Sequence, residues 1–178
     1  FAAVQKLARD QGTHLAIRVE EEPISVTTGD QIECDRAELS GTVVYTWADA
    51  TGVYAAAVDK STSAVIMTPK LVTNWGDRPR VIALSTKILL FGKNGSLDLA
   101  CYALDPADPK TALDGAETVV FSAAGGFSLY YDVERGPSAD TAIFAARRSP
   151  NTSYEVGTVT AALVIAKATK ARTCDGPI

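Results

Sequence analysis

Two pairs of carboxylates stand close together in the sequence and are the first residues to consider for acid–base chemistry. Asp105 and Asp108 belong to an Asp-Pro-Ala-Asp segment, and Asp132 and Glu134 flank one valine. Glycoside hydrolysis uses two such carboxyl groups, one as proton donor and one as nucleophile or base. Both pairs fall at expected turns, where Asp and Pro serve backbone geometry, and no partner that would shift a pKa stands beside them. We therefore predict no catalytic residue.

The residues that hold metals or act as nucleophiles are sparse. His14 is the single histidine, and the cysteines Cys34, Cys101 and Cys174 are far apart, with no CxxC pair. A Ser-His-Asp or Cys-His site would need His14, and nothing near it in sequence supports such a site. Cys101 lies within an apolar run, where a free cysteine behaves as a small buried hydrophobe. The sequence predicts no metal site and no cofactor.

Aromatic and charged side chains near expected turns are the candidates for ligand binding. Indole rings stack on sugars, and the tryptophans stand close to a turn or a link, although Trp75 beside Pro79 equally fits a plug between sheets. The candidate binding-loop residues are Tyr45, Trp47, Trp75, Asp132 and Arg135. A sialidase-like enzyme would need acids and arginines together on one rim. The arginines are too scattered in the sequence to predict this: Arg78, Arg80, Arg135 and Arg147.

Composition excludes two broad classes of function. The 178 residues carry a formal charge of −4, and lysine and arginine form no block, so the electrostatic footprint of a duplex-binding protein is missing. No apolar run reaches the ~20 residues of a membrane helix, and we predict no membrane insertion. A hydrophobic content of 47% is enough to build a real core.

These residues belong to a repeated unit. Leu39 in ELSGTVVYT aligns with Leu84 in ALSTKILLF, an offset of 84 − 39 = 45, and Asp59 aligns with Asp105, an offset of 105 − 59 = 46. A period near 45 in a β-rich sequence predicts an all-β fold of four-stranded antiparallel β-propeller blades, about three of them, forming part of a ring. The alternative is a β-sandwich. The expected segments are 1–31 as an N-terminal extension or partial blade, 32–159 as the blades, and 160–178 as the start of a further blade or a tail.

The expected strands follow from runs of β-branched and apolar residues. The first unit comprises 32–39, 43–47, 53–58 and 64–72. The second comprises 80–84, 87–91, 97–104 and a short strand at 111–113. The third comprises 118–121, 127–133, 141–148 and 154–159, and 160–167 would begin a fourth. Residues 1–10 favour a helix, and Asn94-Gly95 predicts a two-residue type I′ hairpin. Unbroken apolar runs such as KILLF indicate strands covered on both faces.

The amino-acid sequences of two segments carry a family resemblance. GVYAAAVDKSTSAVIMTPKLV (52–72), followed by RPRVIALSTKILLFGKNGSLDLACYALDP (78–106), resembles the propeller repeats of tail nozzle or tubular proteins of short-tailed bacteriophages, and the likeness extends over about 32–159. The resemblance implies a non-enzymatic structural virion protein assembled in the host cytoplasm, a homo-hexamer contacting other tail proteins such as an adaptor ring, with DNA only as passing cargo.

Two other functions stay open at this point. One is a glycan-binding or protein-binding propeller module. The other is a sialidase-like hydrolase, although the Ser-x-Asp-x-Gly-x-x-Trp turn typical of sialidases is missing.

Overall fold

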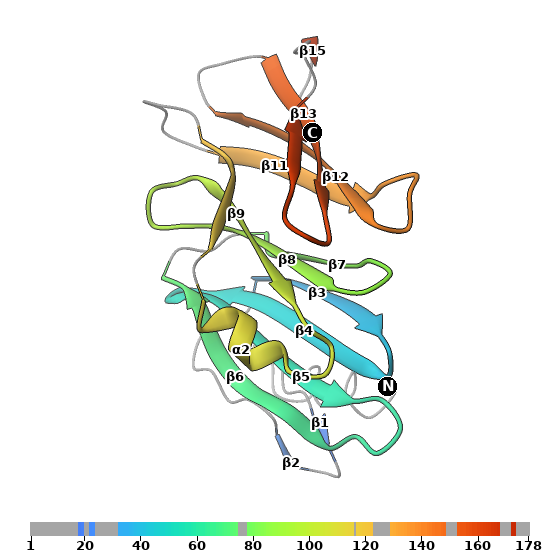
Figure 1. Cartoon of the computed structure of the whole chain (residues 1–178). Coiled ribbons are helices and arrows are strands. Elements are labelled where there is room, and N and C mark those ends of the chain that lie inside the picture. Colours follow the sequence, from blue (N-terminus) through green and yellow to red (C-terminus); the bar gives the residue numbers. More distant parts are fainter. Residues whose placement is uncertain are drawn as a thin grey trace.

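The fold is a stack of three antiparallel sheets. The computed structural model describes residues 18–19, 22–23, 32–74, 78–115, 117–122, 129–148, 153–167 and 172–173. Each sheet forms from four strands consecutive in the chain, which lie side by side in chain order, and Figure 1 shows the sheets following one another from one end of the molecule to the other. We call them blades I, II and III.

Each blade is a simple meander. Blade I contains β3 (Ile32–Leu39), β4 (Thr42–Asp49), β5 (Gly52–Asp59) and β6 (Val65–Thr73). Blade II contains β7 (Arg80–Ala83), β8 (Ile88–Lys93), β9 (Leu99–Leu104) and β10 (Thr118–Phe121). Blade III contains β11 (Leu129–Arg135), β12 (Thr141–Arg148), β13 (Ser153–Thr160) and β14 (Ile165–Lys167), and β15 (Arg172–Thr173) also pairs with β13. The short strands β1 (Arg18–Val19) and β2 (Glu22–Pro23) pair with each other.

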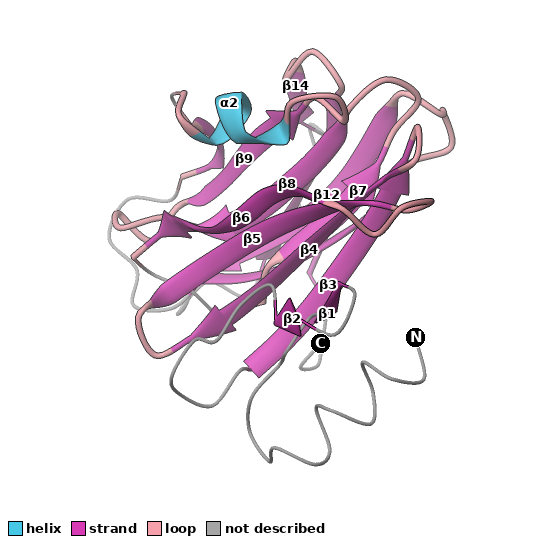
Figure 2. Cartoon of the chain, turned by 90° about the horizontal axis from the view of Figure 1, so that it is seen from below, coloured by secondary structure: helices cyan, strands magenta, loops and turns pink. Residues whose placement is uncertain are grey.

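The first strands of the blades meet at a common axis. Strand β7 contacts β3 on one side and β11 on the other. The expected all-β fold of partial propeller blades is confirmed, since three sheets follow one another around their first strands, whereas a sandwich has two facing sheets. The short helix α2 (Pro109–Leu113) contacts β9 and β6, and Figure 2 shows it beside β9.

The hydrogen bonds give the repeat an unambiguous register. Leu39 pairs with Thr42 across the first hairpin of blade I. At the same place in blade II the amide of Leu84 donates to the carbonyl of Lys87 at 2.8 Å. In blade III the amide of Gly136 donates to the carbonyl of Thr141, also at 2.8 Å. Leu39 and Leu84 are therefore equivalent, as the sequence predicts, and Gly136 is the third equivalent position.

Two apolar cores lie between the blades. Blades I and II enclose one core, which includes Val44, Ala57, Ile88, Leu90 and Leu104. Blades II and III enclose the other, which includes Leu89, Phe91, Cys101, Phe144 and Val159. Successive residues of KILLF thus enter different cores, which explains why its strand is apolar at every position. The predicted burial of Cys101 is confirmed.

Three strand assignments need correction. Residues 111–113, expected to be the fourth strand of blade II, lie in helix α2, because Asp108 caps the helix and Pro109 begins it. Residues 118–121, expected to open the third unit, pair with β9 and complete blade II. Residues 165–167, expected to belong to the first strand of a further unit, pair with β13 and complete blade III. The expected helix at 1–10 lies outside the described residues.

The tight turn was also misplaced. The loop at Asn94 is wider than a two-residue turn, because the Asn94 side-chain oxygen accepts from the amides of Ser96 and Asp98, and Leu97 takes a positive φ of 63°. The two-residue turn lies instead at Ser40-Gly41, where both residues have positive φ, 51° and 80°. This is the geometry of a type I′ hairpin.

Candidate functional site: the axial groove

The three first strands line a shallow groove along the axis, which we call the axial groove. It is open to solvent, and its volume is about 570 Å³. Alanine, valine and isoleucine side chains form its apolar part. Its charged lining residues are Asp35 and Arg36 from β3, Arg80 from β7, and Glu134 and Arg135 from β11.

Asp35 is a structural bridge at this axis. One carboxylate oxygen accepts from the amide of Arg36 at 2.8 Å, and the other accepts from the amide of Val81 in the next blade at 3.0 Å. β3 and β7 are the inner edge strands of their sheets, so both amides belong to sheet edges. The carboxylate satisfies both and joins blade I to blade II.

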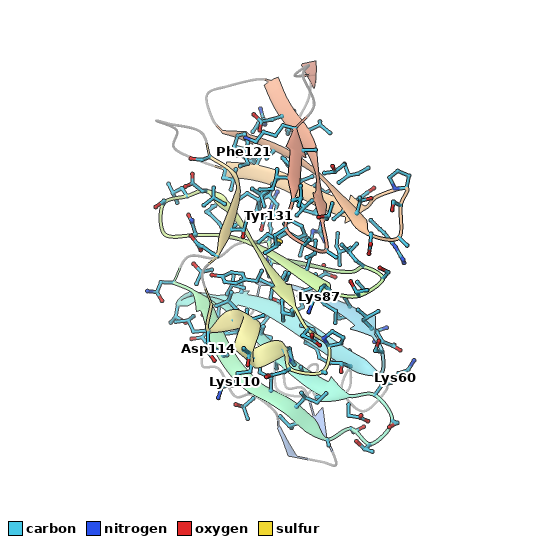
Figure 3. All side chains as sticks on the ribbon, viewed as in Figure 1. Lys60, Lys87, Lys110, Asp114, Phe121 and Tyr131 are labelled. Carbon is cyan, nitrogen blue, oxygen red and sulfur yellow. The ribbon has the colours of Figure 1, made fainter. Side chains whose placement is uncertain are left out.

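Arg80 and Asp132 stand at the positions equivalent to Asp35 in blades II and III. Their side chains form an ion pair, with a nitrogen of the guanidinium 3.4 Å from Oδ1 of Asp132. That oxygen also accepts from the amide of Val133 at 2.9 Å, as Asp35 does from Arg36. Tyr131, labelled in Figure 3, ties the same blades together by donating its hydroxyl to the carbonyl of Arg78.

Glu134 and Arg135 are the charged groups of the groove that remain available. Both are exposed or partly exposed on β11, and within the described part of the chain neither side chain has a hydrogen-bond or ion-pair partner. A carboxylate accepts hydrogen bonds and a guanidinium donates them. They lie on opposite faces of β11, and both line the groove, so its walls carry one hydrogen-bond acceptor and one donor.

The structure separates the five predicted binding residues. Asp132 and Arg135 reach the axis, but on strand β11 and not in a turn. Trp47 lies inside strand β4, is 1% exposed and stacks on Tyr54 with ring centroids 5.9 Å apart. Tyr45 is partly buried in the same cluster. Trp75 lies outside the described residues. Trp47 thus contributes to packing, Arg135 lines the groove, and Asp132 lies beside it in an ion pair with Arg80.

The other acidic pair has a local role. The Asp105 carboxylate accepts hydrogen bonds from the Lys87 ammonium at 2.8 Å and from the amide of Ala107 at 2.9 Å. The hydrogen bond from Lys87 lowers the pKa of the Asp105 carboxyl. Asp108 caps α2 through Thr111. Both carboxylates therefore hold the turn between β9 and α2, as expected for Asp and Pro in such a segment.

Two general features complete the description. In the described ranges no three histidine, cysteine, aspartate or glutamate residues gather as a metal site. None of the helices there is long and apolar enough to cross a membrane.

Comparisons with known proteins give only distant structural likeness. No family model and no curated protein matches the chain. A solved structure described as "Bacteroides ovatus Xyloglucan PUL GH43B" is similar over 85% of this chain at 16% identity, with a TM-score of 0.48. A "thermostable family-43 glycoside hydrolase" is similar over 82% at 12% identity, with a TM-score of 0.46. The chain spans 30% and 54% of those structures. At these scores the likeness decides nothing about activity, and neither match is described as a phage tail protein.

Sequence analysis missed Asp35, Arg36, Arg80 and Glu134 as members of the site. Arg80 and Arg135 are 55 positions apart in the sequence and meet only because both strands are inner edges. The repeat itself was the available signal. Aligning Leu39 with Leu84 makes Asp35 and Arg80 equivalent positions, which predicts that they lie at the same height along the axis.

Proposed function

We propose that the chain is part of a carbohydrate-active β-propeller that binds a glycan in the axial groove. The observation that carries the proposal is the meeting of arginines and acids from three blades: Arg36, Arg80 and Arg135 with Asp35 and Glu134. A sialidase-like propeller would need acids and arginines together, and their presence in one groove supports the proposal. Fold alone does not supply this function, so the proposal rests on the site.

The chemistry of the groove favours a polyhydroxylated ligand. Sugar hydroxyls both donate and accept, which suits Glu134 beside Arg135. The acidic and basic groups nearly balance, so a nucleic acid or another polyanion gains little from the field of the groove. The open shape suits an extended oligosaccharide, since small ligands are bound in clefts that enclose most of their surface.

A glycan array followed by titration calorimetry tests binding. We expect Arg135→Ala to weaken affinity for the strongest array ligand about 10- to 100-fold, because a hydrogen bond to a charged group contributes about 1.5–3 kcal/mol. Lys110→Ala is the matched control, since it removes one exposed positive charge on α2, away from the groove. No binding on the array, or equal effects of the two substitutions, would contradict the proposal.

Hydrolysis of that glycan is a second candidate, favoured by the unpartnered Glu134 carboxylate in a groove that also contains Asp35. A glycosidase needs one carboxyl group that gives a proton and another that stays ionised. A panel of chromogenic glycosides tests this. Release of product that is lost in Glu134→Gln supports hydrolysis, and binding without turnover in the wild type excludes it for the panel.

The virion role remains a prediction from the resemblance alone. It requires a hexameric ring around a channel, contacts with an adaptor ring and DNA as passing cargo, and neither the axial groove nor the comparisons support these features. Electron microscopy of the purified protein tests it. Rings or tubes would support a tail nozzle, and uniformly monomeric particles would oppose it.

A further inference from the structure

We propose that the outer face of blade III is the docking surface for a further four-stranded blade that follows in the same polypeptide. This outer face is the side of blade III that points away from blade II and ends the stack in Figure 1. Its central residues are Ile143, Ala145, Val156 and Thr158.

The repeat register shows what this face corresponds to. Ile143 pairs with Thr158 across β12 and β13, as Leu89 pairs with Ala103 in blade II and Val44 with Ala57 in blade I. The next pairs along are Ala145 with Val156, Phe91 with Cys101, and Thr46 with Ala55. The outer face of blade III thus uses the same positions as the two faces that form the blade interfaces.

Burial differs between these equivalent positions. Val44, Thr46, Ala55 and Ala57 are fully buried against blade II, and Leu89, Phe91 and Cys101 are fully buried against blade III, where Ala103 is partly buried. The four equivalents in blade III are only partly buried. An apolar sheet face of this kind is stabilised when a second sheet covers it.

The Asp132 carboxylate at the axis also corresponds to a group that bridges two blades, namely the Asp35 carboxylate. One carboxylate oxygen of Asp35 accepts a hydrogen bond from the amide of Arg36, and the other accepts from the amide of Val81 in the next blade. Asp132 uses Oδ1 for the amide of Val133 and for Arg80, and no described residue hydrogen-bonds its Oδ2. By this equivalence Oδ2 is placed to accept an inner-strand amide from a following blade.

The two existing interfaces indicate where the occupant comes from. In both, the covering blade is the next one along the chain. A second copy of this chain is disfavoured, because a head-to-tail contact would need the opposite face of blade I, where Trp47 and Ala56 are already fully buried.

Cysteine labelling tests the proposal. In a background with Cys34→Ser and Cys174→Ser, Thr158→Cys is treated with a maleimide in the 178-residue chain and in the complete gene product. Ala57→Cys is the covered control at the equivalent position, and Ser61→Cys is the exposed control. We expect Thr158→Cys to react readily in the 178-residue chain and at least about tenfold more slowly in the complete product, since labelling then requires local opening.

Each outcome decides the matter. Equal labelling of Thr158→Cys in both proteins would overturn the proposal. Protection that appears only at concentrations where light scattering shows a doubled mass would identify a second copy as the occupant and overturn it as well. As an independent readout, Asp132→Asn should lower the Tm of the complete product more than that of the 178-residue chain, because the amide nitrogen cannot accept the incoming hydrogen bond.

Discussion

At the residue scale, single aspartate side chains connect neighbouring blades and hold turns. Asp35 bridges two inner edges, and Asp59 holds the turn after β5 by accepting from Ser61 and Thr62. Each of these carboxylates accepts hydrogen bonds from two backbone amides. Their charge serves the fold, which leaves Glu134 and Arg135 as the groups of the groove that are free for ligand.

Replacing Asp35 tests the bridge. We expect Asp35→Asn to lower the free energy of unfolding by about 1–3 kcal/mol, because the side-chain NH₂ cannot accept and one edge amide loses its partner. Glu38→Gln on the same strand is the control: its ion pair with Lys60 is exposed, and such pairs contribute about 0–1 kcal/mol. Urea unfolding measures both, and equal effects would show that the bridge is unimportant.

The turn at Asp59 gives a pH dependence. The hydrogen bond from the Ser61 hydroxyl, followed by bonds from Thr62, lowers the pKa of Asp59 to about 2 from an ordinary value near 3.8. Because the folded pKa lies below the unfolded one, the stabilisation is complete above about pH 4 and is lost as the pH falls towards 2. NMR titration of the carboxyl carbon should give the low pKa in the wild type and a higher pKa in Ser61→Ala with Thr62→Ala, where only the backbone amides of the turn still donate to the carboxylate.

At the element scale, close packing between neighbouring strands of blade III depends on a glycine. A Cβ added at Gly157 on β13 would lie 2.6 Å from two ring carbons of Phe144 on β12. Phe144 is fully buried in the core between blades II and III. The same Cβ would lie 2.7 Å from the carbonyl oxygen of Ala166 on β14, so Gly157 is required by the space that the ring and this backbone occupy.

Substitution of that glycine is a sharp test of the packing. We expect Gly157→Ala to destabilise the protein by about 1–3 kcal/mol, since the ring must move within a filled core. Gly92→Ala on β8 is the matched control, because its added Cβ meets nothing nearer than a Val53 methyl at 4.0 Å. Thermal unfolding should show a lower Tm for Gly157→Ala alone. An unchanged Tm would mean that the core between blades II and III is looser than described.

The elements also show how far sequence reasoning reaches. The blade type, the strands of blade I and the burial of Cys101 follow from apolar periodicity, which is a local signal. The third unit was misassigned because the spacing changes: Thr42, Lys87 and Thr141 are equivalent, and the intervals are 87 − 42 = 45 and 141 − 87 = 54. Helix α2 accounts for part of the longer second interval, because it lies between the third and fourth strands of blade II. Residues 118–121 were therefore assigned to blade III, although they form the fourth strand of blade II.

At the scale of the whole molecule, the site forms where the first strands of the three blades come together. Arg36, Arg80 and Arg135 share no sequence motif, and only the meeting of β3, β7 and β11 brings them to one groove. Sequence reasoning named Asp132 and Arg135 as candidate binding residues because they are polar residues near an expected turn; Arg135 lines the groove and Asp132 pairs with Arg80 beside it. It missed the rest because contacts between inner strands depend on the ring, which no local pattern encodes.

The same view separates the two proposals. The groove is lined by the inner edges of the blades and the docking surface is the outer face of blade III, and the two meet at Glu134, which lines the groove and pairs with Ile143. A failure of glycan binding leaves the fourth-blade proposal intact, and free labelling at position 158 leaves the groove intact.

The most direct test is NMR mapping of the array glycan onto the protein in solution. Amide shifts are followed while the strongest array ligand is titrated. We expect concerted shifts at Arg36 on β3, at residues 80–83 on β7 and at residues 133–135 on β11, with one shared Kd. Shifts confined to a single blade, or gathered away from these three strands, would contradict a ligand site at the axis.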